Sequence, residues 1–254
     1  MKYLSVAEAR NLPGLRLVLT AEVPGPWGEA AKAVFAARNV AYVPVEQTAM
    51  APNAELVEWT GQRNAPTACL DDEPPLTGWR DMIHLAERLG TGPSLLPTAQ
   101  RDRALCLGYV AEIAGPDGFG WNRRLQIMSA YLADEKAAAE LQPMITAYGV
   151  TPEAASNASA RLVAIMTGLA EQLHRQAEAG SAYLIGDGLT ALDLYWACFS
   201  MMVRPLPAEV NPMPDWLRPL YTALDPMVDA AVDPILIAHR DHIYQRHIGL
   251  PLDY

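Results

Sequence analysis

The N-terminal part of the chain alternates short apolar stretches with amphipathic ones. Two stretches, 15–20 (LRLVLT) and 40–46 (VAYVPVE), are rich in branched or alternating apolar residues, which is typical of short strands. Between them, segment 27–38 carries an apolar stripe at helical spacing, made of Ala30, Ala31, Val34 and Phe35. Strand, helix and strand in this order predict two parallel strands joined by a crossover.

The same alternation continues as far as residue 89. Residues 53–60 (NAELVEWT) have a short helical pattern, 67–70 (TACL) is typical of a strand, and the DDEPP that follows indicates a turn. Residues 79–89 form a helical pattern with one apolar face. Glycine, proline and serine then dominate 91–98 (GTGPSLLP), which indicates a linker.

Beyond the linker the chain is predicted to be almost entirely helical. The expected helices span 99–114, 121–141, 151–178 and 190–203, and shorter pieces broken at prolines follow from residue 213. A small α/β unit followed by an all-helical unit predicts two domains. Their expected boundaries are 14–90 for the α/β domain, 91–98 for the linker and 99–254 for the helical domain.

The acidic charge balance narrows the class of partners. A formal net charge of −10 over 254 residues argues against a protein that binds nucleic acid or an anionic membrane, since both need a basic surface. No apolar stretch approaches the roughly 20 residues of a membrane helix, and charges and a proline interrupt the first fourteen residues, MKYLSVAEARNLPG. We expect a cytoplasmic protein that binds a small molecule or another protein.

The cysteines and histidines do not indicate a metal site or a disulfide framework. The cysteines are odd in number, far apart and outside any C-x-x-C motif, which favours buried thiols: Cys69, Cys106 and Cys198. Three of the five histidines lie near the C-terminus without the i, i+4 pairing and acidic partner of a helical metal site: His239, His242 and His247. We expect these to lie at the surface or at a pocket rim.

Three features together resemble the glutathione transferase family. The order of strands and helices up to residue 89 is similar to the thioredoxin-like domain of that family. NAPTACLDD resembles the segment in which a cis-proline begins the third strand, which places Pro66 at the cis position. YLIGDGLTALDL is similar to the capping motif late in the helical domain, with Thr190 as N-cap and Asp193 three residues on.

The resemblance implies a thioredoxin-like N-terminal domain followed by an all-α domain, and a homodimer. It also implies glutathione as co-substrate, held through backbone groups beside the cis-proline. Because Pro66 has no N–H, the N–H and C=O of Ala65 are free to pair with an extended thiol-containing peptide. A second, apolar electrophilic ligand is expected to lie next to the thiol.

The chain departs from the family where the thiol is activated. The family has Tyr, Ser or Cys at the turn into the first long helix, whereas VPGPWG places Gly25 at that position. The nearest substitutes are Thr20 and Glu22, and because an ionised carboxylate would raise a thiol pKa, Thr20 is the candidate catalytic residue. Backbone N–H groups around Trp27 and Gly28 offer a second source of thiolate stabilisation.

A second departure lies at the start of the helix at 79–89. The family has an acidic residue followed by Ser there, which bind the amino and carboxylate groups of glutathione, whereas this chain has Gly78 and Trp79. The N–H groups of that helix start could still bind a carboxylate, with Thr77 as the cap. A carboxylate-bearing ligand other than glutathione is therefore an open alternative.

Aromatic and basic residues follow a glycine-rich break at 115–120. The resemblance implies that this region faces the ligand cleft, so we expect a substrate pocket lined by Phe119, Trp121, Asn122 and Arg123. The alternative is a surface turn with solvated arginines.

Two functions follow from the sequence. The first is a glutathione transferase-like protein that binds glutathione or a related thiol together with an apolar electrophile. The alternative is a non-catalytic ligand-binding protein on the same fold, because position 25 has no side chain. A thiol–disulfide oxidoreductase is disfavoured, since no cysteine stands at the helix start.

Overall fold

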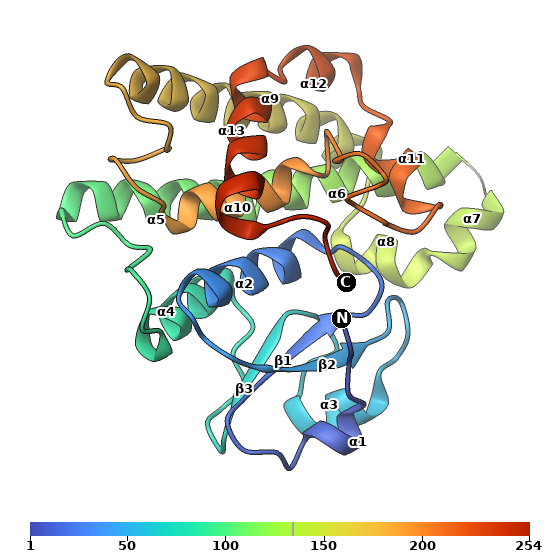
Figure 1. The fold of residues 1–254 in the computed structure, drawn as a ribbon. Helices are drawn as coiled ribbons and strands as arrows, with labels where there is room; N and C mark the ends of the chain where they lie inside the picture. Colours follow the sequence, from blue (N-terminus) through green and yellow to red (C-terminus); the bar gives the residue numbers. More distant parts are fainter. Residues whose placement is uncertain (134) are drawn as a thin grey trace.

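The computed structural model describes residues 1–133 and 135–254 (Figure 1). Its sheet has three strands in the order β2-β1-β3, with bounds Leu15–Thr20 for β1, Val43–Gln47 for β2 and Thr67–Leu70 for β3. β1 pairs parallel to β2 and antiparallel to β3, with Val18 opposite both Val45 and Thr67. The predicted parallel crossover is therefore present, and it runs through helix α2 (Pro26–Ala37).

Helices cover both faces of this sheet. Leu17 and Leu19 of β1 pack into the main core with α2 and with α4 (Trp79–Leu89), whereas Val18 faces the opposite side. There it packs with residues of β2, of α1 (Val6–Ala9) and of α3 (Ala54–Thr60). β1 is thus buried on both faces, as expected of the central strand of an α/β domain.

The rest of the chain is helical. The longer helices are α5 (Gln100–Ala114), α6 (Phe119–Ser129), α9 (Pro152–Glu178), α10 (Ala191–Ser200) and α13 (Pro234–Ile243). The shorter ones are η1 (Ala130–Ala133), α7 (Glu135–Glu140), α8 (Gln142–Tyr148), α11 (Leu217–Thr222), α12 (Pro226–Ala230) and η2 (Tyr244–Ile248). A single helix over 121–141 was wrong: α6 ends at Ser129, whose hydroxyl donates back to the Gln126 carbonyl at 2.8 Å.

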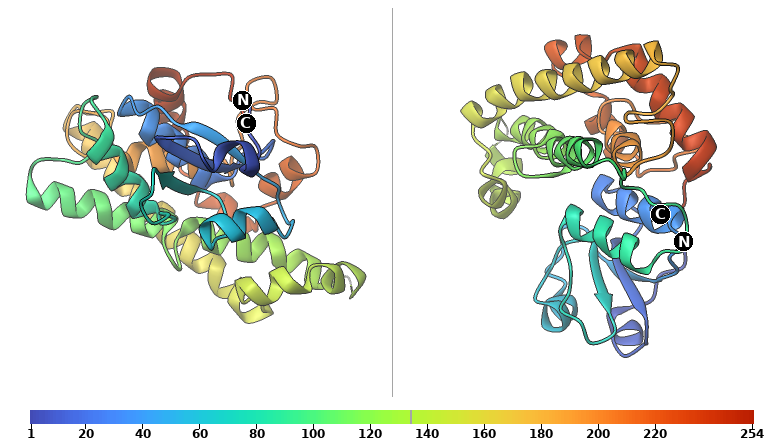
Figure 2. Two further views of the ribbon diagram at one scale, coloured as in Figure 1. Left: turned by 90° about the horizontal axis from the view of Figure 1, so that it is seen from below. Right: turned by 90° about the vertical axis from the view of Figure 1, so that its left-hand side faces the viewer.

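α2 connects the two parts of the molecule. It lies between the sheet and α10, as both ribbon views show (Figures 1 and 2). Residues of the sheet, α2, α5, α9 and α10 belong to one continuous apolar core. The two chain termini lie close together, with C directly above N in Figure 1, and the Met1 ammonium pairs with the Asp253 carboxylate. No helix in the described part of the chain is long and apolar enough to cross a membrane.

A buried capping box sets the start of α10. The carboxylate of Asp193 accepts from the N–H of Thr190 at 2.8 Å and from its hydroxyl at 2.7 Å. It also accepts from the N–H of Leu184 at 2.8 Å and lies 2.9 Å from Nε2 of His239. His239 is therefore a buried partner of Asp193, and its expected place at the surface or a pocket rim was wrong.

Candidate functional site

The turn from β1 into α2 presents unpaired backbone donors. Gly25 is the N-cap of α2 and has no side chain to cap it, while Pro26 at the first helical position has no N–H. The N–H of Glu29 bonds the Gly25 carbonyl at 2.9 Å, so the first intrahelical bond begins there. The N–H groups of Trp27 and Gly28, which precede it, therefore point out of the helix end, where the helix dipole favours negative charge.

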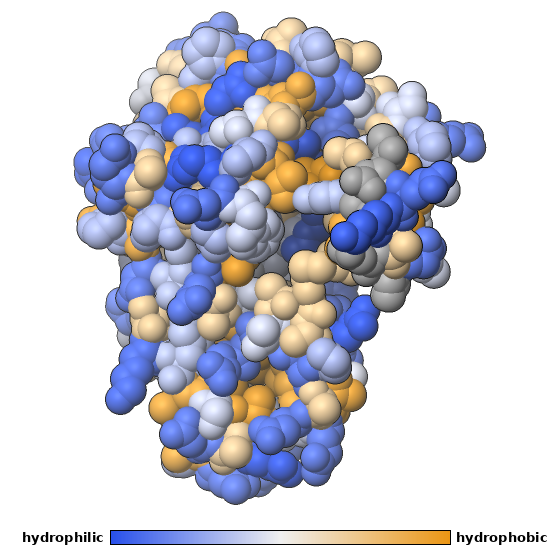
Figure 3. Space-filling view, turned by 90° about the vertical axis from the view of Figure 1, so that its right-hand side faces the viewer, coloured by the Kyte–Doolittle hydropathy of each residue, from blue (hydrophilic) through white to orange (hydrophobic). Residues whose placement is uncertain are grey.

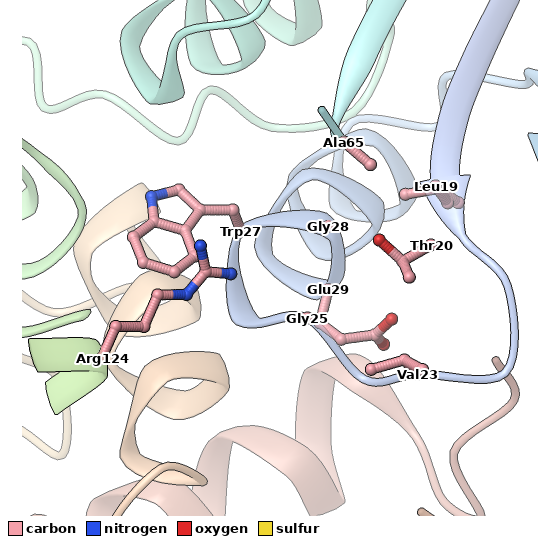
Figure 4. A pocket seen from close by; sticks show the side chains of 9 residues that line it. All are labelled: Leu19, Thr20, Val23, Gly25, Trp27, Gly28, Glu29, Ala65 and Arg124. Carbon is pink, nitrogen blue, oxygen red and sulfur yellow. The ribbon is translucent and has the colours of Figure 1, made fainter. Parts of the chain in front are cut away.

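The indole of Trp27 is fixed by groups from the helical part. Its Nε1–H donates to the carbonyl of Ala114 at 2.9 Å, and its ring packs edge-on against Phe199 with centroids 4.8 Å apart. Gly120 makes this packing possible: a Cβ there would lie 2.5 Å from Phe199 and 2.7 Å from Trp27. One face of the indole is turned toward Arg124 (Figure 4).

Arg124 covers that face of Trp27. Its guanidinium carbon lies 4.3 Å from the centroid of the indole ring, and Nη1 donates to the hydroxyl of Tyr148 at 2.9 Å. Figure 4 shows the side chain reaching from α6 across the cleft toward α2. Within the described ranges no carboxylate pairs with Arg124. The cleft thus contains a guanidinium without a counter-ion, close to the N-terminal end of α2.

Ala65 forms the opposite wall. The Ala65–Pro66 peptide bond is cis, which confirms the predicted conformation, and Ala65 lines the cleft directly before β3. No hydrogen bond in the described part of the chain uses the backbone N–H or C=O of Ala65. These groups are free to pair with the backbone of an extended ligand.

The hydroxyl of Thr20 lies at the cleft, but its proton is already used. Thr20 Oγ1 donates to Oε1 of Gln47 at 2.7 Å, across the parallel pair of β1 and β2. A hydroxyl has one proton, so in this arrangement Thr20 can accept a hydrogen bond from a ligand and cannot donate one to a thiolate. The candidate catalytic role of Thr20 therefore requires that this bond be broken.

Glu29 is the acidic group of the cleft. Its carboxylate lies one turn into α2 and points toward Thr20 and Val23 (Figure 4). Both carboxylate oxygens accept from Nζ of Lys32, at 3.0 and 3.1 Å. Burial raises the pKa of Glu29 above its usual 4.5, and the nearby charge of Lys32 opposes that shift without cancelling it. Sequence reasoning missed Glu29, although an acid one turn past a Gly-Pro helix start is a readable signal.

Nine residues line the cleft: Leu19, Thr20, Val23, Gly25, Trp27, Gly28, Glu29, Ala65 and Arg124. Figure 3 shows a hollow on one side of the molecule, with hydrophobic residues above and below it and hydrophilic residues at its floor. The enclosed volume at the nine residues is about 30 Å³, which holds about two water molecules. A larger ligand must therefore extend beyond this volume or displace a lining side chain.

The architecture around this cleft matches solved glutathione transferases. A glutathione S-transferase from Methylobacterium radiotolerans, in complex with glutathione sulfonate, superposes with a TM-score of 0.60 over 91% of this chain and 91% of that chain, at 13% identity. A glutathione S-transferase domain-containing protein from Marinobacter aquaeolei gives 0.60 over 91% and 98%, at 15% identity. The chain has the glutathione transferase fold. Neither a protein-family model nor a curated protein matches the sequence.

A third structure on the glutathione transferase fold carries a ligand. The glutathione S-transferase from Methylobacillus flagellatus has glutathione bound, and it superposes with a TM-score of 0.58 over 89% of this chain and 98% of that chain. Its sequence is 10% identical to this one, so the likeness concerns the fold alone.

The start of α4 does not join the cleft in this structure. Gly78 is the N-cap, in place of the expected Thr77, and its N–H donates to Asp81 Oδ2 at 3.2 Å. The carbonyl of Trp79 accepts from the hydroxyl of Tyr195 at 3.0 Å. Neither Gly78 nor Trp79 is among the residues that line the cleft.

None of the four residues expected to line a substrate pocket after the glycine-rich break is among the nine that line this cleft, although Arg123 lines a separate pocket with Gln126 and Ser159. Phe119 is fully buried and packs edge-on against Trp196 at 5.4 Å. Trp121 packs against Tyr148 at 5.0 Å. Asn122 is buried and donates to the Asp117 and Gly118 carbonyls at 2.8 and 3.0 Å, so it holds the turn before α6.

The side chain of Arg123 donates hydrogen bonds to backbone carbonyls of the C-terminal part of the chain. Its Nε–H donates to the carbonyl of Met202 at 2.9 Å, and Nη2 donates to the carbonyls of Leu220 and Ala223, both at 2.8 Å. Burial lowers the pKa of this guanidinium to about 10. Consecutive residues on a helix point about 100° apart, so Arg124 reaches the cleft and Arg123 faces away from it.

The remaining chemistry-bearing side chains lie outside the cleft. Cys69, Cys106 and Cys198 are free and buried, and burial raises the pKa of the first two thiols to about 11 and that of Cys198 further. No group of three or more His, Cys, Asp or Glu in the described ranges could hold a metal ion.

Proposed function

We propose that this protein is a glutathione transferase-like enzyme that binds glutathione, or a related thiol, in the cleft between α2 and Ala65. The observation that carries the proposal is the convergence of three groups there. The free backbone groups of Ala65, the outward N–H groups of Trp27 and Gly28, and the Arg124 guanidinium all line one space. The fold and the ligands named in two of its solved neighbours support it.

The positive end of α2 and Arg124 would take the place of a side chain at position 25. A helix end and a nearby cation both stabilise a thiolate over a thiol, so they lower the pKa of a bound thiol. The outward N–H groups of Trp27 and Gly28 can donate hydrogen bonds to the sulfur directly. This stabilisation of the thiolate does not require a Tyr, Ser or Cys side chain. The protein then holds an electrophile close to the thiolate, where positioning accounts for most of the rate.

The apolar side of the cleft would receive the second ligand. Leu19, Val23 and the indole of Trp27 present apolar surface next to the start of α2. When Arg124 moves to admit the ligands, it uncovers the indole face that it now occupies. A planar apolar electrophile can replace the guanidinium there by stacking on the indole.

A non-catalytic ligand-binding protein on the same fold is the second candidate. The observation that favours it is the bond from Thr20 Oγ1 to Gln47, which leaves the cleft without a free hydroxyl donor among its described lining residues. Such a protein would retain a thiol or an apolar ligand and would not join them.

The test has two steps. Isothermal titration with glutathione should show saturable binding, and an activated aryl halide added with glutathione should give the thioether conjugate faster than the uncatalysed reaction. Binding without conjugation would support the second candidate. The absence of heat and of any thermal shift at millimolar glutathione would contradict glutathione binding altogether.

A further inference from the structure

A thiol that attacks an electrophile must first lose its proton. Of the nine residues that line the cleft, Arg124 has donors only, and the Thr20 hydroxyl is bonded to Gln47. Glu29 is the one lining residue whose side chain is an acidic proton acceptor. Its carboxylate faces the space bounded by Thr20, Val23 and Gly25 (Figure 4).

We propose that Glu29 is the proton acceptor for the bound thiol, and so a catalytic residue that replaces the missing side chain at position 25. The inference rests on the proposed transferase function. It concerns a different step, since thiol binding depends on Ala65 and on the α2 backbone, whereas deprotonation depends on Glu29.

The surroundings of Glu29 suit a proton acceptor. Burial raises its pKa above 4.5, which brings the carboxyl closer to neutral pH and makes the carboxylate a better base. The ammonium of Lys32, 3.0 Å from the carboxylate, favours its ionised form, which is the form that accepts a proton. The other groups that interact electrostatically with Glu29 all have raised pKa values and are neutral near pH 7: Tyr3, Tyr42, Cys198, Tyr244 and Tyr254.

The proton transfer balances within the cleft. The S–H bond breaks, its proton joins a carboxylate oxygen of Glu29, and the sulfur keeps the electron pair. That pair forms the C–S bond with the electrophile, and the leaving group departs with its own pair. The Glu29 carboxyl then returns its proton to the leaving group or to water, which regenerates the carboxylate.

A carboxylate beside a sulfur would disfavour the thiolate if it stayed ionised. Glu29 avoids this because it becomes neutral as the thiolate forms, so the negative charge is moved and not doubled. The neutral carboxyl then has an O–H that can donate to the sulfur. The thiolate meanwhile lies next to the N–H groups of α2 and to Arg124, which stabilise it.

Glu29→Gln tests the inference, with Glu55→Gln as its matched control. Both acids lie in the first turn of a helix of the α/β part, but Glu55 is exposed on α3. We expect Glu29→Gln to lower kcat/KM for conjugation at neutral pH about 100-fold, the lower end of general-base effects. Glutathione affinity should be nearly unchanged, and Glu55→Gln should match the wild type.

Chemical rescue separates a proton acceptor from a structural residue. In Glu29→Ala, added formate should restore part of the lost turnover, and it should have no effect on Glu55→Gln. Equal turnover and equal pH profiles in the wild type and Glu29→Gln would overturn the inference and leave the transferase function standing. Loss of turnover in both Glu29 variants with no rescue by formate, and with intact binding, would also overturn it. Absence of conjugation by the wild type would overturn the proposed function and this inference with it.

Discussion

The guanidinium of Arg124 lies 4.3 Å from the centroid of the Trp27 ring, and the same guanidinium donates to the hydroxyl of Tyr148 at 2.9 Å. These three side chains come from α6, α2 and α8. A cation at the mouth of the cleft is thereby stacked on an aromatic face of the α/β part and tied to a phenol of the helical part.

Arg124→Met should weaken the binding of anionic ligands to the cleft. Methionine keeps much of the length of the side chain and removes the charge. A hydrogen bond to a charged group contributes about 1.5–3 kcal/mol, so we expect the dissociation constant of glutathione to rise at least tenfold. Titration calorimetry at low ionic strength measures this. Arg101→Met, at an exposed position on α5, is the control; equal effects of the two substitutions would contradict the assignment.

Gly120→Ala should destabilise the protein through a steric clash. The added Cβ would lie 2.5 Å from Phe199 and 2.7 Å from Trp27, so the Trp27 ring has to move. Overpacking of this kind costs about 1–3 kcal/mol. Gly108→Ala in α5 meets nothing within 4 Å and should stabilise the fold by about 0.5–1 kcal/mol. Urea unfolding followed by circular dichroism compares the two, and a Gly120→Ala protein as stable as wild type would refute the clash.

Asp193→Ala should be among the most damaging single substitutions. It leaves the N–H groups of Leu184 and Thr190 without a partner and removes the carboxylate beside His239. Breaking a buried pair costs about 3–5 kcal/mol. The matched control is Glu8→Ala, which breaks the exposed capping box of α1 with Ser5 and should cost no more than about 1 kcal/mol. Thermal unfolding of both variants checks the ranking, which similar losses would contradict.

The stability of the wild type relative to Glu29→Gln should depend on pH. The folded-state pKa of Glu29 is raised above 4.5, chiefly by burial, so the folded protein holds this proton more tightly than the unfolded chain. The stabilisation from the protonated form is complete below about pH 4.5 and is lost as the pH rises through the folded-state value. Glutamine does not ionise. The melting temperature of Glu29→Gln minus that of the wild type should therefore increase from pH 4 to pH 7. A difference that stays constant with pH would contradict the raised pKa.

The elements of the α/β part were readable because their patterns are local. β1 is a short continuous run of mostly apolar residues and α2 carries a stripe at helical spacing, so the type of each element can be predicted from neighbouring residues. The cis bond at Pro66 was predicted through the resemblance to a family, since a proline alone does not indicate a cis bond. The Thr-x-x-Asp pattern predicts the start of α10 from the residues alone, and the resemblance added its place in the fold.

The cleft was harder to predict because its residues meet over long sequence distances. Nothing near Thr20 indicates that its proton goes to Gln47, because that bond depends on the register of β1 with β2. The choice between Arg123 and Arg124 depends on how the turn before α6 sets the rotation of that helix. The sequence shows two adjacent arginines, and only the structure shows which one faces α2.

Gly25 has a consequence for how the protein responds to reactive chemicals. Of the described residues that line the cleft, none carries a thiol, a phenol or a free hydroxyl donor, and the three buried thiols lie outside it. Alkylating agents and peroxides therefore meet no cysteine thiol among the described residues where the ligand is proposed to bind. Activity that depends on backbone amides and ionic groups should therefore persist through oxidative exposure that would inactivate an enzyme built on a reactive cysteine.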